Sequence, residues 1–70
     1  MSHTYSVSEI VGSSPEGTDA AIRSALERAA ATVRNIEWFE VVSTRGHADS
    51  TGVLHFQVTL KVGFRLEDPA

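Results

Sequence analysis

The sequence predicts an α+β fold in which a single helix packs against a three-stranded antiparallel sheet, in the order β-α-β-β. Three observations predict it: a helical apolar period over residues 15–35, strict alternation over residues 53–66, and aromatic and β-branched residues over 38–45. With 70 residues and a mass of 7.6 kDa, residues 1–70 are expected to form one domain.

The first strand is predicted over residues 5–11, where Tyr5, Val7 and Val11 alternate with serines. A helix is predicted to follow, with Ser14 as its cap and Pro15 at its first position, where the missing N–H costs nothing. Apolar residues then recur at steps of three and four, which draws one stripe: Ile22, Leu26, Ala29, Ala30, Val33 and Ile36. Because this stripe is rich in alanine, we expect the helix to approach the sheet closely.

The second and third strands are predicted over residues 38–45 and 53–66, with turn residues (GHADSTG) between them. In the third strand the even-numbered residues are apolar, namely Phe56, Val58, Leu60, Val62, Phe64 and Leu66. The odd-numbered residues are polar or small, namely His55, Gln57, Thr59, Lys61, Gly63 and Arg65. The sheet is therefore expected to bury one face and to present a polar one. One helix cannot cover so long a strand, which indicates contact with other subunits.

Composition excludes several classes of protein. Six Lys and Arg against nine Asp and Glu give a formal net charge of −3, which argues against a non-specific nucleic-acid binder. No apolar run is long enough to cross a bilayer, and the N-terminus has no signal-peptide core, so a cytoplasmic protein without a membrane partner is expected. There is no cysteine, so disulfides cannot stabilise this short chain, and we expect a homo-oligomer.

No catalytic or metal-binding motif is apparent. His3, His47 and His55 lack metal-ligand spacing, and no serine lies in a nucleophile elbow. Glu37 and Glu40 flank Trp38 closely enough to act as acid and base, but two solvated charges are the preferred interpretation. The sequence therefore predicts no enzyme and no metal site.

Trp38 is the only tryptophan, and two interpretations are open for it. It is either an anchor of the monomer core or part of a binding site. Gln57 lies on the polar face and can both donate and accept hydrogen bonds, while Arg45 and Arg65 carry planar groups that suit phosphate. An indole, an amide and guanidinium groups together suit a planar heteroaromatic ligand with an anionic tail.

Short motifs along nearly the whole chain then identify a resemblance: EIVGSSPEG, DAAI, WFEV, RG, FQV and KVGFRLED, in this order and spacing. The chain closely resembles the dodecins, small flavin-binding proteins. The resemblance implies a β-α-β-β subunit whose sheet wraps around the helix, and a hollow homododecamer. It also implies flavins stacked in pairs between tryptophans at subunit interfaces.

The resemblance further implies site residues. Trp38 matches the stacking tryptophan, Gln57 the glutamine at the isoalloxazine edge, and Arg45 an arginine placed at the flavin, while Arg65 looks like a phosphate contact. Some bacterial members also bind coenzyme A, for which the expected residues are Arg28, Thr32 and Arg34, with Arg28 and Thr32 one helical turn apart. His3 stands where bacterial relatives often carry a basic residue.

The expected function is therefore storage and sequestration of a flavin without turnover. FMN is the first expectation, FAD and riboflavin stay open, and light protection would follow from quenching of the stacked flavin. Three alternatives remain: a flavin-dependent enzyme, a structural scaffold without ligand, and a coenzyme A-binding protein without flavin function.

Overall fold

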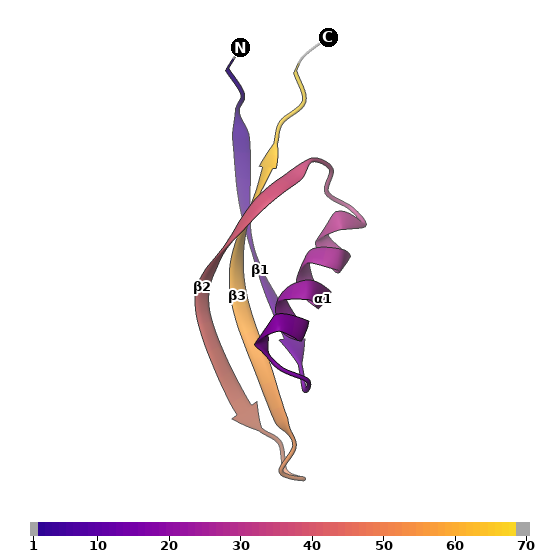
Figure 1. The fold of residues 1–70 in the computed structure, drawn as a ribbon, viewed down its shortest axis with the longest axis vertical. Helices are drawn as coiled ribbons and strands as arrows, with labels where there is room; N and C mark the ends of the chain where they lie inside the picture. Colours follow the sequence, from indigo (N-terminus) through magenta and orange to yellow (C-terminus); the bar gives the residue numbers. More distant parts are fainter. Residues whose placement is uncertain (1, 69–70) are drawn as a thin grey trace.

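The structure, a computed structural model, describes residues 2–68 and contains a three-stranded antiparallel sheet with one helix (Figure 1). Its elements are β1 (Tyr5–Ser14), α1 (Thr18–Ala30), β2 (Ile36–Ala48) and β3 (Leu54–Arg65). This β-α-β-β order and the antiparallel sheet confirm the predicted subunit fold.

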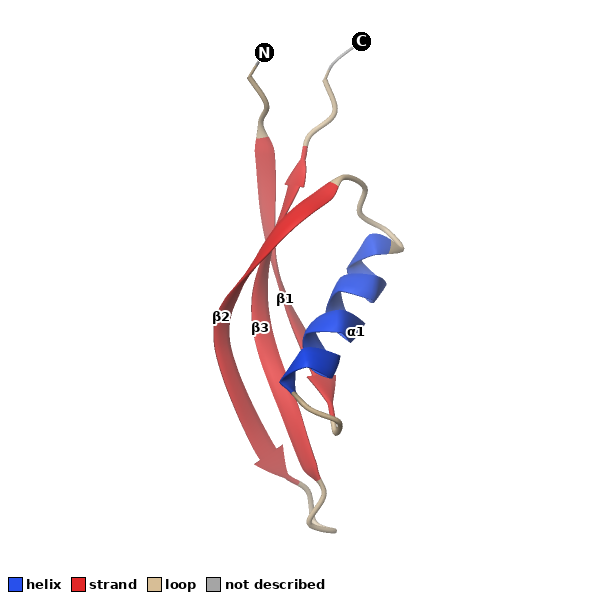
Figure 2. Cartoon of the chain, in the orientation of Figure 1, coloured by secondary structure: helices blue, strands red, loops and turns tan. Residues whose placement is uncertain are grey.

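The sheet has the strand order β1-β3-β2, so the last strand of the chain lies at its centre (Figure 2). This position explains why β3 has the most regular alternation in the sequence. A central strand is paired along both edges and must keep one register with two neighbours. Thr4, just before β1, lies beside Leu66, just after β3: the Leu66 N–H donates to the Thr4 carbonyl at 2.8 Å.

The predicted start of the helix is wrong by three residues. The first strand runs beyond residues 5–11 because β1 stays paired with β3 as far as Ser14, opposite Phe56. Ser14 therefore does not cap the helix; its hydroxyl accepts the Glu16 N–H at 3.1 Å. The chain reverses at Gly17, and α1 begins at Thr18 without a side-chain cap.

The helix also ends earlier than predicted, at Ala30 rather than at residue 35. The backbone tightens there, since the N–H groups of Ala31 and Thr32 donate to carbonyls three residues back. Val33 therefore lies beyond the helix, and Ile36 opens β2. Ile36 still packs against the core, from the strand, which is why it fitted the apolar stripe.

The two long strands are joined by a shorter turn than predicted. Gly46 and His47 belong to β2, opposite Phe56 and His55, so Gly46 does not end the strand as expected. The turn covers residues 49–53, and β3 begins at Leu54 rather than at residue 53.

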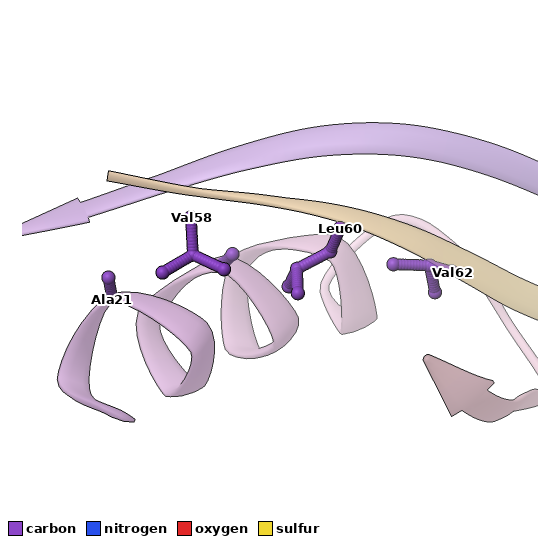
Figure 3. Packing of buried hydrophobic residues seen from close by; sticks show 5 residues of the cluster. Ala21, Val58, Leu60 and Val62 are labelled. Atoms are coloured by element: carbon purple, nitrogen blue, oxygen red, sulfur yellow. The ribbon is translucent and has the colours of Figure 1, made fainter. Parts of the chain in front are cut away.

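The core consists of two helix residues, Ala21 and Ala25, and three residues of β3, Val58, Leu60 and Val62 (Figure 3). The apolar parity of β3 faces the helix, as predicted. The close approach expected from the alanines occurs at Gly12 of β1, where an added Cβ would overlap the Ala21 carbonyl and the Ala25 methyl group. Small residues on both elements thus set the helix–sheet distance.

The helix packs on β1 and β3 and leaves β2 largely uncovered on the same side. Phe39 of β2 is 46% exposed and lines an open groove with Ile22 and Leu26. The hairpin of β2 and β3 also extends past the helix (Figure 1). The monomer therefore exposes apolar surface on both sides of its sheet.

Candidate functional site

The face of the sheet opposite the helix carries the four residues that were predicted to bind the flavin. Antiparallel partners share a face, so the pairing register defines this outer face. It is formed by the odd-numbered residues of β3 from His55 to Arg65 and their partners, which include Tyr5, Val7 and Glu9 on β1 and Trp38, Glu40, Ser43, Arg45 and His47 on β2.

A β-bulge places Trp38 on the outer face. Ile36 pairs with Phe64 and Trp38 pairs with Gly63, so Glu37 is an extra residue without a partner on β3. Strict alternation would have put residues 36 and 38 on the same face, but the bulge turns them to opposite faces. Ile36 packs on the core, whereas Trp38 lies outside it.

A second irregularity, between Val41 and Ser43, returns Arg45 to the face that carries Trp38. Residues 38 and 45 are an odd number of positions apart, so an unbroken strand would place them on opposite faces. With the bulge, Arg45 lies opposite Gln57 and both share the outer face. The arrangement of predicted site residues on one surface thus depends on two bulges in one strand.

The Trp38 indole lies directly over Gly63 of the central strand. A Cβ added to Gly63 would overlap three indole atoms, so only glycine leaves room for the ring. Trp38 is nevertheless 41% exposed. Trp38 is therefore not an anchor of the monomer core: its ring forms an aromatic platform on the outer face. That this platform belongs to a binding site stays a prediction.

Beside this platform, side chains from all three strands converge on Glu37. The Tyr5 hydroxyl donates to Glu37 Oε1 at 3.1 Å, and Arg65 Nε lies 3.3 Å from Glu37 Oε2. The hydrogen bond to Glu37 is the main cause that raises the pKa of Tyr5 above its ordinary value. Glu37 is therefore not the isolated solvated charge that the sequence suggested.

Arg65 is also fixed through its backbone. Asn35, which has a φ of 65°, accepts the Arg65 N–H at 3.0 Å and donates its side-chain amide to the Arg65 carbonyl at 3.3 Å. Asparagine tolerates this left-handed conformation better than most residues. The start of β2 and the end of β3 are thus held together next to the aromatic platform.

Gln57 and Arg45 lie at the other end of the outer face. Six positions of β3 separate Gln57 from Gly63, which corresponds to ~20 Å along an antiparallel strand. One chain therefore brings Trp38 near Arg65 and Gln57 near Arg45, but these two pairs lie far from each other.

His47 and His55 stack across the hairpin, with ring centroids 5.1 Å apart and planes 17° apart. Asp49 accepts from His55 Nε2 at 3.0 Å and also from the Thr51 and Val53 backbone N–H groups. These hydrogen bonds hold the pKa of Asp49 well below its usual range, with the Thr51 hydroxyl as the largest cause. Within residues 2–68 no group of three or more potential ligands could hold a metal ion.

The residues expected to bind coenzyme A lie near the end of the helix. Arg28 is in the last turn of α1, and Thr32 lies two residues past its end. Both nevertheless line one hollow beside Ile10. Arg34 pairs with Glu67 at 3.5 Å, and His3 is exposed ahead of β1. Coenzyme A binding stays a prediction.

Three residues of this site were not predicted from the sequence as parts of it: Gly63, Glu37 and Tyr5. For Gly63 a signal exists, because a glycine inside an otherwise regular strand often marks the close approach of another group. For Glu37 and Tyr5 no such signal exists, because their contact depends on the bulge.

Comparison with known proteins finds relatives along nearly the whole chain. Residues 4–67 match the family model for dodecin. The curated dodecin of Thermus thermophilus is 50% identical over 68 residues, which cover 97% of this chain and 99% of that protein.

Solved structures match equally well. The dodecin from Streptomyces davaonensis matches with a TM-score of 0.91 and 53% identity, covering 97% of this chain and all of that one. The dodecin from Streptomyces coelicolor matches with a TM-score of 0.87 and 52% identity, over 96% of each chain. In the part of the chain that the structure describes, no helix is long and apolar enough to cross a membrane. By its fold, its sequence and the extent of these matches, the chain belongs to the dodecin family.

Proposed function

We propose that this protein binds and stores a flavin, FMN foremost, in the cytoplasm, as a homododecamer and without catalytic turnover. The observation that carries the proposal is the Trp38 indole, laid over Gly63 on the outer face and 41% exposed. An aromatic ring held flat on a strand is a stacking surface for a planar heteroaromatic system. In this position the indole can also donate an electron to the excited flavin, which quenches it and protects the cell from light.

The phosphate of FMN has a suitable partner in Arg65. This residue lies two positions from Gly63 on the same strand and face, ~7 Å along the strand from the platform. Its guanidinium is one-third exposed and presents planar donors of the kind that bind phosphate. The same position could serve FAD, whereas riboflavin has no charged group for it to bind.

The remaining contacts come from other subunits in this proposal. Gln57, the proposed partner of the isoalloxazine edge, and Arg45 lie ~20 Å from Gly63 in one chain, which is too far for one ring system to reach both ends. A site that combines indole and amide therefore requires at least two protomers. The oligomer and the flavin site are accordingly one proposal.

The test is a titration of FMN with flavin-free protein while flavin emission is followed. We expect saturable quenching at a fixed ratio of flavin to subunit. Replacing Trp38 with Ala removes the stacking surface and should weaken binding by ~5- to 150-fold, corresponding to ~1–3 kcal/mol for stacking of a base on an aromatic side chain. Flavin still bound to this variant should regain emission.

Phe39→Ala is the matched control. Phe39 is a neighbouring aromatic residue with similar exposure, 46%, but it faces the helix side of the sheet. Its removal should leave FMN quenching unchanged as long as size-exclusion chromatography shows the same oligomer as for the unmodified protein. Equal FMN affinity in the Trp38→Ala variant and the unmodified protein would refute the site. Emission unaffected by any amount of protein would refute the flavin function and leave the structural scaffold as the better interpretation.

A further inference from the structure

We propose that Glu37 sets the selectivity between phosphorylated and unphosphorylated flavins, by balancing the charge of Arg65 beside the stacking platform. This inference rests on the proposed flavin site. It concerns a residue that contacts Arg65 rather than the ring, and it assigns Glu37 a positioning and charge-balancing role.

The geometry ties Glu37 to both parts of the site. Glu37 is the extra residue of the first bulge, so it directly precedes Trp38 and has no partner on β3. Its Oε2 forms an ion pair with Arg65 Nε at 3.3 Å, and its Oε1 accepts a hydrogen bond from the Tyr5 hydroxyl at 3.1 Å. Each carboxylate oxygen is therefore engaged, one by a cation and one by a neutral donor.

This arrangement fixes which donors of Arg65 face a ligand. The ion pair occupies Nε, which leaves the two terminal nitrogens of the guanidinium as the pair available for a phosphate. Tyr5 contributes no charge at neutral pH, since a tyrosine ionises only near pH 10, and the bond to Glu37 raises the pKa of its hydroxyl further. Arg65 and Glu37 then sum to zero net charge.

A neutral cluster discriminates weakly between flavins. A phosphate monoester carries about −1.5 to −2 charges at pH 7. Arg65 attracts the phosphate, and Glu37, which is paired with Arg65, repels it. Riboflavin has no phosphate, so neither interaction applies to it. Glu37 thus lowers the advantage of FMN over riboflavin without touching the stacking surface, which both flavins share.

The experiment measures dissociation constants of FMN and riboflavin, by flavin emission, for the unmodified protein and for Glu37→Gln. Glutamine keeps an oxygen that accepts from Tyr5 or Arg65 and removes the negative charge. Removing one charge near a partly exposed phosphate should raise the ratio of riboflavin to FMN dissociation constants ~3- to 10-fold. The increase should shrink in high salt, because these charges are partly exposed.

Two further variants separate charge from structure. Glu37→Asp keeps the charge and should keep the ratio of the unmodified protein, while Tyr5→Phe removes only the neutral hydrogen bond and should do the same. The riboflavin dissociation constant reports on the platform itself and should change little in all three variants.

The proposal is overturned if Glu37→Gln leaves the ratio unchanged or lowers it while both flavins still bind. It is also overturned if Glu37→Asp raises the ratio as much as Glu37→Gln does, since charge is then not the cause. If the unmodified protein binds neither flavin, the proposed function fails and this inference fails with it. The behaviour of the unmodified protein thus distinguishes the two failures.

Discussion

At the scale of single residues, the position of the Trp38 indole depends on the absence of a side chain at Gly63. The indole occupies the volume that any side chain at residue 63 would need. The contact also covers Gly63, which is buried although it lies on the outer face of the sheet. The ring is thereby held flat and near the Arg65–Glu37 pair.

Gly63→Ala is therefore expected to displace the indole from β3. Trp38 is the only tryptophan, so its emission reports this directly and should move to longer wavelength as the ring enters water. FMN affinity should fall by about tenfold or more, because the stacking surface loses its fixed orientation.

Gly46→Ala is the matched control for this substitution. Gly46 also lies in a long strand, but the nearest atom to an added Cβ there is the His55 carbonyl oxygen, at 3.3 Å. It should leave both the Trp38 emission and FMN binding near those of the unmodified protein. An unchanged tryptophan spectrum in Gly63→Ala would contradict the role given to Gly63.

Which residues could be predicted from sequence follows from how local their signal is. The alternation of apolar and polar residues in β3 is visible in the sequence itself. The position of Val58, Leu60 and Val62 in the core, and of Gln57 on the opposite face, could therefore be predicted directly. The contacts of Glu37 depend on pairing between distant strands, so no local pattern predicts them.

At the scale of elements, β2 decides where the candidate site lies. Its two bulges turn Trp38 and Arg45 to one face, although simple alternation separates them. The sequence predicts that a strand exists here, from its aromatic and β-branched residues, but a bulge is fixed by the register with β3. The site face of β2 could therefore not be assigned before the structure.

The helix shows the same limit at its ends. Its middle follows from the apolar period, but the helix is shorter than predicted at both ends. At its C-terminal end residues 31–35 leave the helix through a tightened turn and belong to no strand. β1 retains Ser14 through pairing with β3, and β2 takes Ile36. Tertiary pairing thus overrides the local capping signal.

The turn between β2 and β3 depends on Asp49, which accepts hydrogen bonds from Thr51, Val53 and His55. These bonds depress the pKa of Asp49 in the folded protein, so its stabilisation is present above the ordinary carboxyl pKa of ~4 and is lost as pH falls below it. Asp49→Asn should therefore lower the melting temperature at pH 7.

The same comparison at pH 3 and below should show a smaller difference, since Asp49 of the unfolded chain then takes up a proton that the folded protein binds only at its lowered pKa. The measurement is thermal unfolding of both proteins across this pH range. A difference that grows toward acid would contradict the sign of this linkage.

At the scale of the whole molecule, the monomer is too extended to be a complete unit. Its radius of gyration is 14.6 Å, against ~11 Å for a compact chain of this length. Its accessible surface is 5085 Å², against ~4,300 Å² for a compact monomer of this mass. The exposed apolar residues on both sides of the sheet explain where the excess lies, and they favour assembly.

In our account, assembly also completes the flavin site, whose parts one chain does not bring together. The aromatic platform and the Gln57–Arg45 pair lie at opposite ends of one face, so our account requires that a flavin be shared between protomers. The sequence argued for an oligomer from short length and absent cysteines, and the family resemblance implied flavins at subunit interfaces. The strand register adds that Trp38 and Gln57 of one chain lie at opposite ends of the outer face.

The most direct test of this account is a crystal structure of the protein with FMN. The account predicts an isoalloxazine ring in van der Waals contact, ~3.5–4 Å, with the Trp38 indole of one protomer and hydrogen-bonded at its edge to Gln57 of another. A ring held by a single chain, or bound away from Trp38, would contradict it.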